Sequence, residues 1–498
     1  MSDMKAKEAL ITLHPAGEAA EEFRFECAGG KIAVMPASDR LTPYGGAAAW
    51  SHYLERIGVV ADLAQRFPVP RTSPNATPVA DVLQAFMFNC LMGGRRFAHA
   101  RRVQDDRALA AILGLKKARM CGEDAFARML AKVPQPTART WLAWSERDLY
   151  AALPSAFVAD WDSTVNTRYG RQDDVAVGYN PHKPGRGSHH PLLCVVAGTR
   201  LALHMEWRPG NTVSATRWIE AMERVWSHPD VPPRLKLNRG DCGFAQEKIL
   251  AWHEMPGVPR PRYLFKLRLT ANVRRALARI PWPEWTGEPT PGLEQTAETR
   301  VQLDGWSRAR RVLVTRTLKP ANPSPQDVFW GADQEEFCAY VTDLGADEAT
   351  PAQGVLSYRQ RGDAENVFDE LKNQWGFAGF CSGKGVVTET AARVLLLTYN
   401  LWSLFARVVQ GEGRHHEAVT SRDELLVIPA KLVESGRQQT LKLSVGEQWW
   451  SALSRAYVRL QRWLAATAPQ LSVQQSFERY LCWHNPLNPD DWLPKLAP

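Results

Sequence analysis

The sequence has no Cys-x-x-Cys pair among its eight cysteines, which are scattered along the chain. This spacing indicates neither a zinc knuckle nor a disulfide framework, and it fits a reducing environment. A long apolar run is also lacking: the longest spans residues 394–406 between two arginines, whereas a bilayer span needs about 20 residues. The first residues carry no apolar core of the kind that secretion signals have. We therefore expect a cytoplasmic protein with no membrane partner.

Acidic residues are outnumbered, with 53 Asp and Glu against 61 Lys and Arg, which gives a net charge of +8 and a pI near 9.1. The excess is clustered. Residues 83–139 hold eleven basic and four acidic residues, residues 234–279 eleven and three, and residues 300–319 six and one. Clustered positive charge suits a polyanion such as nucleic acid, because each neutralised phosphate releases counterions. Solvated surface faces are the alternative explanation for any single cluster.

A chain of 498 residues is expected to form two to four folding units. Residues 1–150 have mostly helical spacing of apolar side chains and are expected to bind DNA. Short helices at 108–115 and 123–133 around a glycine turn fit either a helix-turn-helix DNA reader or an ordinary bundle. Residues 151–270 change to the order β-β-β-α-β-α-β, with the first strand at 157–162 and the fourth at 234–237. This order predicts an α/β fold, a mixed sheet with flanking helices.

The rest of the chain departs from that rhythm before returning to helices. Residues 271–354 contain a Pro- and Trp-rich piece and β-like runs at 311–317 and 337–342, which predicts a mostly β insertion. Helices resume in residues 355–412 as the last part of the core. Residues 413–498 are expected to be a helical C-terminal region whose core includes Trp449, Trp450 and Trp463.

Acidic side chains occur where a sheet could bring them together. Asp162 ends the first predicted strand, and Asp241 follows the fourth. For either residue alone, a role in a turn or a helix cap is the ordinary alternative. A third element is a predicted helix from about residue 357, where a narrow stripe at about 100° per residue borders an apolar face. The stripe contains an acid, two bases and a phenol: Glu365, Arg361, Lys372 and Tyr358. A simple ion pair between Arg361 and Glu365 is the alternative here.

These four residues match the Y-(2)-R-(3)-E-(6)-K signature of a large superfamily of bacterial insertion-sequence transposases with the DDE triad, which the chain resembles. The resemblance extends to the Asp-Ser-Thr tripeptide at Asp162 and the RGDCGF segment at Asp241. The stretch from Gly178-Tyr179-Asn180-Pro181 to Ser188-His189-His190-Pro191 looks like a loop that recurs in one branch. The resemblance covers about residues 40–465, and its motifs lie within residues 157–410.

The resemblance implies a ribonuclease H-like fold with Asp162, Asp241 and Glu365 as metal ligands. Glu365 lies 124 positions after Asp241, which implies an inserted β domain as in the hairpin-forming members, in agreement with the predicted insertion. Asp160 is the alternative to Asp162, because residues two apart share a strand face, although the tripeptide favours Asp162.

Carboxylates suit Mg²⁺ or Mn²⁺, and two such ions per active site can activate a water or a 3′-hydroxyl and stabilise the leaving oxygen. The resemblance further implies that Arg361 and Lys372 bind phosphate near the cut, with Tyr358 assisting.

Further DNA contacts are expected outside the triad. Trp306 lies among arginines and is expected either to stack on a flipped base, as in hairpin-forming relatives, or to pack in the core. Adjacent histidines in the basic loop point to opposite sides of a strand and make a poor metal pair, so DNA contact or structural hydrogen bonding is expected there. The expected DNA-binding residues are Arg361, Lys372, Trp306, Arg308, Arg310, Arg311, Lys183, Arg186, His189, His190 and Arg239.

By resemblance, the chain is expected to be a transposase that acts as a homodimer on double-stranded DNA in the bacterial cytoplasm, associated with the nucleoid. It would bind the terminal inverted repeats of its insertion sequence, cleave the ends and transfer the 3′-hydroxyls into target DNA. The alternatives are a metal-dependent nuclease without strand transfer and an inactive transposase-derived DNA-binding protein. A glycoside hydrolase with paired acids leaves the basic clusters unexplained.

Overall fold

The computed structural model describes residues 23–36, 40–151, 153–287, 293–318, 335–411, 415–466 and 492–494. Its N-terminal part is mostly helical, as the spacing predicts. Three short strands come first: β1 (Phe23–Cys27), β2 (Gly30–Val34) and β3 (Leu41–Thr42). The helices that follow are α1 (Ala47–Ile57), α2 (Val59–Gln65), α3 (Val79–Leu91), the 3-10 helix η1 (Phe97–Val103), α4 (Arg107–Ile112), α5 (Ala125–Leu130) and α6 (Gln135–Ala151).

An eight-stranded sheet has the order β12-β13-β14-β11-β10-β4-β8-β9. Five of its strands come from the predicted core: β4 (Phe157–Ser163), β8 (Leu192–Val196), β9 (Leu201–Glu206), β10 (Leu235–Gly240) and β11 (Arg262–Lys266). β4, β10 and β11 are parallel, whereas β8 is antiparallel to β4 and to β9. The helices α7 (Trp218–Trp226) and α8 (Glu247–His253) connect them. Counted along the chain, the five strands stand in the order 3-2-1-4-5. This arrangement confirms the predicted α/β, ribonuclease H-like fold class.

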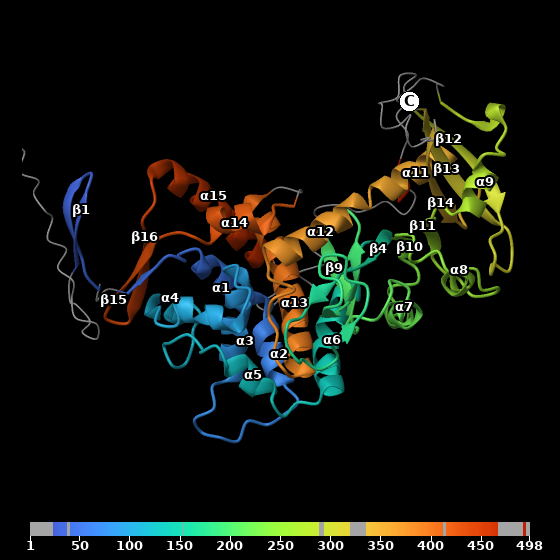
Figure 1. Ribbon diagram of the computed structural model, residues 1–498. Coiled ribbons are helices and arrows are strands. Elements are labelled where there is room, and N and C mark those ends of the chain that lie inside the picture. The colour runs from blue at the N-terminus through green and yellow to red at the C-terminus, as the bar shows by residue number, and fades with distance from the viewer. Residues whose placement is uncertain are drawn as a thin grey trace, which may run out of the picture.

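The insertion is β-rich, and its strands extend the core sheet. It contains α9 (Ala271–Leu277), the 3-10 helix η2 (Trp282–Glu284), β12 (Glu294–Val301), β13 (Arg310–Leu318) and β14 (Glu335–Thr342). β14 pairs antiparallel with β11, and β13 and β12 follow outward (Figure 1). The insertion and the core therefore share one continuous sheet.

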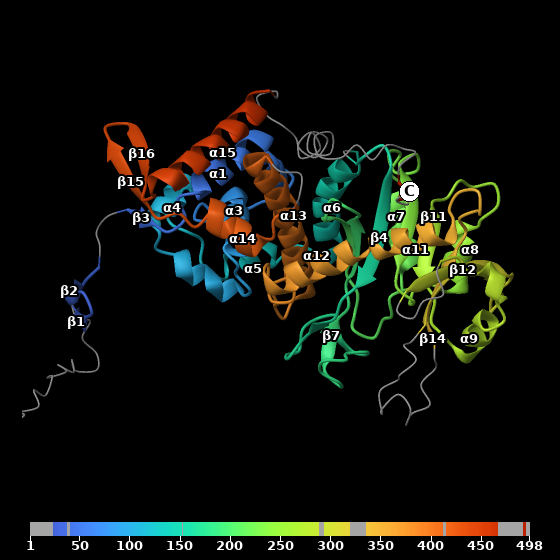
Figure 2. The same cartoon turned by 90° about the horizontal axis from the view of Figure 1, so that it is seen from above.

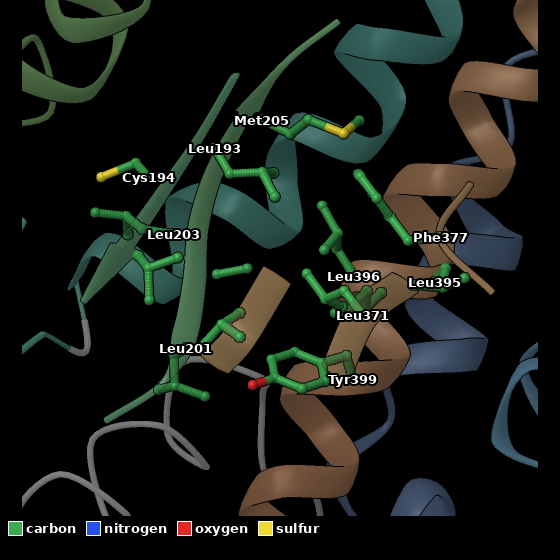
Figure 3. Packing of buried hydrophobic residues seen from close by; sticks show 14 of the residues in the cluster. Leu193, Cys194, Leu201, Leu203, Met205, Leu371, Phe377, Leu395, Leu396 and Tyr399 are labelled. Carbon is green, nitrogen blue, oxygen red and sulfur yellow. The ribbon is translucent and has the colours of Figure 1, made fainter. Parts of the chain in front are cut away.

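Three described helices follow the insertion: α11 (Pro351–Arg359), which packs on the insertion strands, then α12 (Gly362–Asn373) and α13 (Gly385–Gln410). Seen from above, α13 lies between the helices α1, α3 and α15 on one side and β4 and β11 on the other (Figure 2). Apolar side chains from β8 and β9 meet those of α12 and α13 in one cluster, including Leu193, Leu203, Leu371 and Leu396 (Figure 3). This contact fixes α12 beside the sheet.

Helix α13 is the one helix in the described ranges that is long and apolar enough to cross a membrane. The protein itself buries the whole of its most apolar stretch. Its composition is therefore accounted for by its position in the core.

The C-terminal region is partly β. It contains α14 (Ala418–Leu425), a hairpin of β15 (Ala430–Ser435) and β16 (Gln438–Leu443), and α15 (Glu447–Ala465). Trp463 is buried as predicted, but the prediction that Trp449 and Trp450 are core residues is wrong, since they are 37% and 50% exposed. They lie on the first turn of α15, before its first buried residue, Leu453. In the core, the chain after β4 forms a small three-stranded sheet with the order β5 (Asn166–Thr167), β7 (Gly187–His189), β6 (Ala176–Val177).

Candidate active site

Two of the predicted acids lie at the same edge of the sheet. β4 and β10 are neighbouring parallel strands in which Asp160 pairs with Arg239 and Trp161 with Gly240. Asp162 and Asp241 are the next residues on the two strands, so this register brings them side by side at the carboxyl ends. Each carboxylate accepts a hydrogen bond from a nearby backbone N–H, from Ser163 at 2.7 Å and from Gly243 at 2.8 Å.

The third acid, Glu365, lies in the first turn of α12, just after the junction with α11. The predicted single helix is two helices joined by a tight turn, in which the N–H of Arg361 bonds to the carbonyl of Tyr358 at 2.9 Å. Arg361 is the residue before α12, and α12 packs against β4. The Nη2 atom of Arg361 lies 2.9 Å from Oδ2 of Asp162, and its Nη1 atom lies 2.8 Å from Oε1 of Glu365. One guanidinium therefore links the acid on the sheet to the acid on the helix.

The electrostatics reflect this gathering of charge. Burial raises the pKa of Asp162 to about 6; Arg361 opposes the rise, and the negative charges of Asp241 and Glu365 add to it. Burial lowers the pKa of Lys372, against the attraction of Asp162. Burial raises the pKa of Tyr358, whose ring lies 4.6 Å from that of Tyr340, so its hydroxyl keeps its proton.

The donor chemistry fits hard divalent cations, because three carboxylates supply oxygen ligands. Burial is the main cause of the raised pKa of Asp162, and the charges of Asp241 and Glu365 add to it. The spatial arrangement is less complete. Within the described ranges, no three His, Cys, Asp or Glu side chains lie close enough together to hold a metal ion. In this conformation Arg361 takes the position of a cation between Asp162 and Glu365. Metal binding by all three acids therefore requires Glu365, whose side chain is 66% exposed, to leave Arg361 and turn toward the two aspartates.

Asp160, the alternative ligand, lies deeper in the sheet and is fully buried. Both of its oxygens are bonded by Arg239, at 2.7 Å and 2.8 Å, and Arg239 also donates to the carbonyl of Ser357. This arrangement favours Asp162 as the ligand. It also corrects the expectation that Arg239 contacts DNA, because that side chain is 1% exposed and its charge is already paired.

The basic loop divides into an exposed part and a buried part. Lys183 and Arg186 are exposed. His189 and His190 are buried, and each makes structural hydrogen bonds: Arg168 donates to Nδ1 of His189 at 3.0 Å, and Nδ1 of His190 donates to the carbonyl of Thr212 at 2.7 Å. Of the two roles expected for these histidines, their burial favours structural hydrogen bonding over contact with DNA.

The arginines around Trp306 are neutralised by acidic neighbours. Trp306 is 8% exposed and packs in the core, with the guanidinium of Arg310 5.1 Å from its ring centre. Arg310 pairs with Glu247 and Glu254, Arg308 also pairs with Glu254, and Arg311 pairs with Glu298. Burial thus corrects the expected DNA contacts of Trp306, Arg310 and Arg311, and of this group only Arg308 is exposed.

Sequence analysis missed the loop 208–217, which borders both aspartates. The Ser214 hydroxyl lies 3.0 Å from that of Ser163, beside Asp162, and a side chain on Gly243, beside Asp241, would collide with Ser214. Arg208 is fully buried and holds the loop by donating to the carbonyls of Val213, Ser214 and Thr216. No local pattern marks these residues, because their partners come from other strands.

Comparisons with known proteins cover most of the chain. Residues 26–465 match the family model described as transposase DDE domain group 1. Among solved structures, the chain is similar to the piggyBac transposase synaptic complex with hairpin DNA, at 13% identity and a TM-score of 0.40, over 92% of this chain and 87% of that chain. No curated protein matches.

Proposed function

Because the chain belongs to the transposase DDE domain group 1 family, we propose that it is a transposase that cleaves the ends of its insertion sequence and transfers their 3′-hydroxyls into target DNA. The observation that carries the proposal is the linkage of three acids at one sheet edge. Asp162 and Asp241 end adjacent strands, and Arg361 ties Glu365 to Asp162. We propose Asp162, Asp241 and Glu365 as the ligands of two Mg²⁺ or Mn²⁺ ions.

When bound, such ions supply an activated water or 3′-hydroxyl and charge stabilisation for the leaving oxygen. The chain's own residues position the DNA. Arg361 can exchange its two carboxylates for two oxygens of a phosphate, since a guanidinium donates in a fork. Lys372, half-buried on the same helix, adds a point charge near Asp162. Tyr358, which keeps its proton, can donate one hydrogen bond to a phosphate oxygen.

A basic surface next to α12 supports DNA binding. We define the η1 face as Arg95, Arg96, His99 and Arg102. Arg95 donates to the carbonyl of Asn373 at the end of α12, so the η1 face adjoins the helix that carries Glu365. In the described part of the chain, no acidic group lies within salt-bridge distance of its three arginines, whose charges help to lower the pKa of His99 below the value that burial alone would give. Unneutralised clustered charge favours phosphate.

The active site is tested with labelled DNA carrying the element's ends and Mg²⁺. Asp162→Ala, Asp241→Ala and Glu365→Ala are each expected to abolish cleavage and joining, because each removes a proposed ligand. Asp369→Ala is the matched control, an exposed acid on α12, and should keep activity. Full cleavage by any of the three variants would remove that residue from the proposal, and cleavage without joining by the wild type would favour a nuclease.

The η1 face is tested by the salt dependence of DNA binding. Arg96→Gln with Arg102→Gln should make the slope of log affinity against log salt shallower by about 1 to 2, at roughly 0.9 per lost phosphate contact. Arg437→Gln with Arg455→Gln, two exposed arginines of the C-terminal region, is the control. Equal slopes in all three proteins would exclude the η1 face from the DNA interface.

A further inference from the structure

The hairpin of β1 and β2 has one apolar and one charged face. Phe25 pairs across the hairpin with Ile32, and the neighbouring pair Glu26 and Lys31 forms a salt bridge of 3.5 Å. Because side chains alternate along a strand, Phe25, Ile32 and Val34 share one face, and the ion pair occupies the other. The three apolar residues are 54%, 48% and 48% exposed, which leaves the apolar face uncovered.

This hairpin lies away from the rest of the molecule. Figures 1 and 2 show it at the edge of the structure, on the side of β15 and β16, and every described side chain of β2 is exposed. A two-stranded hairpin is at best marginally stable in water without a surface to pack on. An exposed apolar face of this kind usually marks an interaction site.

A surface that fits the hairpin lies on the same chain. In the three-stranded sheet β16-β15-β3, β16 is an edge strand, and no other strand of the described residues pairs with its outer side. Next to it is a hollow of about 520 Å³, lined among others by Leu441, Leu443, Val445 and Trp450. An unpaired edge beside an apolar hollow can accept a strand whose backbone continues the sheet and whose side chains fill the hollow.

We propose that the β1–β2 hairpin of one chain packs against β16 and the adjoining hollow of a second copy, so that two chains exchange hairpins. The hairpin leads directly into β3, which lies at the opposite edge of the sheet from β16, with β15 between them. Only six residues separate Val34, the end of the hairpin, from Leu41, the start of β3, and its own β16 lies beyond the whole width of the sheet, whereas a second copy imposes no such limit. Reciprocal exchange between two identical chains gives a closed, symmetric dimer.

The first test measures the mass of the full chain in solution without DNA, by light scattering or sedimentation. The wild type is expected to have the mass of two chains. Phe25→Ser with Ile32→Ser should weaken the dimer at least about tenfold, since it removes the apolar contact without touching the core. The matched control, Glu26→Gln with Lys31→Gln, alters the charged face of the same hairpin and should remain dimeric. A single-chain wild type, or an unchanged dimer in the apolar variant, would overturn the proposal.

The second test identifies which chain receives the hairpin. Cys27 is an exposed native cysteine of the hairpin, and Gln438→Cys and Lys442→Cys place a partner at either end of β16. All chains carry Cys381→Ser, which removes the other exposed cysteine of the described residues, and Cys482→Ser, which removes the cysteine outside them. Two kinds of chain are mixed and then oxidised. One keeps Cys27 and has no new cysteine on β16; the other carries Cys27→Ser and one new cysteine on β16.

Exchange predicts a covalent two-chain product between the two kinds of chain for at least one position on β16, lost on reduction. Asp369→Cys on α12, far along the chain from this sheet, should give none. A separate sample of chains that carry both Cys27 and the new cysteine is oxidised in parallel. A disulfide that forms only within those single chains, with none between the mixed chains, would overturn the proposal by showing that the hairpin docks on its own β16. Neither test uses catalysis, so failure here leaves the proposed transposase function standing.

Discussion

Replacing Arg361 with glutamine should change metal binding in opposite directions at low and high pH. The side chain is 6% exposed and holds Asp162 and Glu365 at 2.9 Å and 2.8 Å. It acts in two ways. Its charge favours the ionised form of Asp162, whose pKa burial raises to about 6, and it competes with any cation for the same two carboxylates.

The size of the first effect follows from the geometry. Two unit charges about 4 Å apart interact by roughly 4 kcal/mol at an effective dielectric of about 20. Asp162 is 21% exposed, and solvent screening reduces this value to roughly 2 kcal/mol, or one to two pKa units. Loss of Arg361 should therefore raise the pKa of Asp162 further above its present value of about 6. A raised carboxyl pKa means that the proton competes with the metal over a wider range of pH.

The assay is calorimetric titration of Mg²⁺ and Mn²⁺ into the full chain. Near about pH 6.5 the Arg361→Gln protein should bind roughly five- to tenfold more weakly than the wild type, because most Asp162 is protonated. Near about pH 9 it should bind at least as tightly, because Asp162 is ionised and the competing guanidinium is gone. Arg359→Gln, on α11, is the control, since that arginine pairs with Glu294 in the insertion. A variant-to-wild-type ratio that is the same at both pH values would refute the reasoning.

Three further predictions concern stability, each measured by urea unfolding. Asp160→Asn should lower the free energy of unfolding by about 3 to 5 kcal/mol, because it leaves a buried arginine unpaired, whereas Asp162→Asn should change it by about 1 kcal/mol or less; equal losses would contradict their separate roles. Burial lowers the pKa of His189 to about 4, so between about pH 6.5 and 4 the unfolded chain binds a proton that the folded chain does not. The free energy of unfolding should therefore decrease by roughly 3 kcal/mol as the pH is lowered from about 6.5 to 4. His189→Asn should lack this part of the decline, and parallel pH curves would show that the histidine is not its source. Gly178→Ala should destabilise by about 2 kcal/mol or more, because the added Cβ would lie 2.1 Å from a backbone carbonyl oxygen, while Gly362→Ala, with nothing within 4 Å, should not; similar behaviour of the two would argue against the close approach.

Local sequence patterns predicted the elements that carry the site. Apolar runs of strand length placed Asp162 and Asp241 at the ends of β4 and β10, and the structure puts those ends side by side. The helical spacing of Tyr358, Arg361 and Glu365 is kept through the turn between α11 and α12. The reason is that backbone hydrogen bonds from residue i+3 to residue i continue a helical conformation there. These features depend on neighbours within a few positions, which the sequence states directly.

The sequence by itself therefore determined the order of strands in the core, the class of fold and the acids Asp162, Asp241 and Glu365 as candidates for the site. Only the tertiary structure decided which charges are available there. Asp160 and Arg239 lie 79 positions apart and neutralise each other inside the sheet, and Arg310 is neutralised by acids of α8 and the residue that follows it. The joining of the insertion strands to β11 and the exposure of Trp450 were likewise decided by packing. The physical reason is that burial and ion pairing depend on groups brought together from distant parts of the chain, and no local spacing encodes which groups those are.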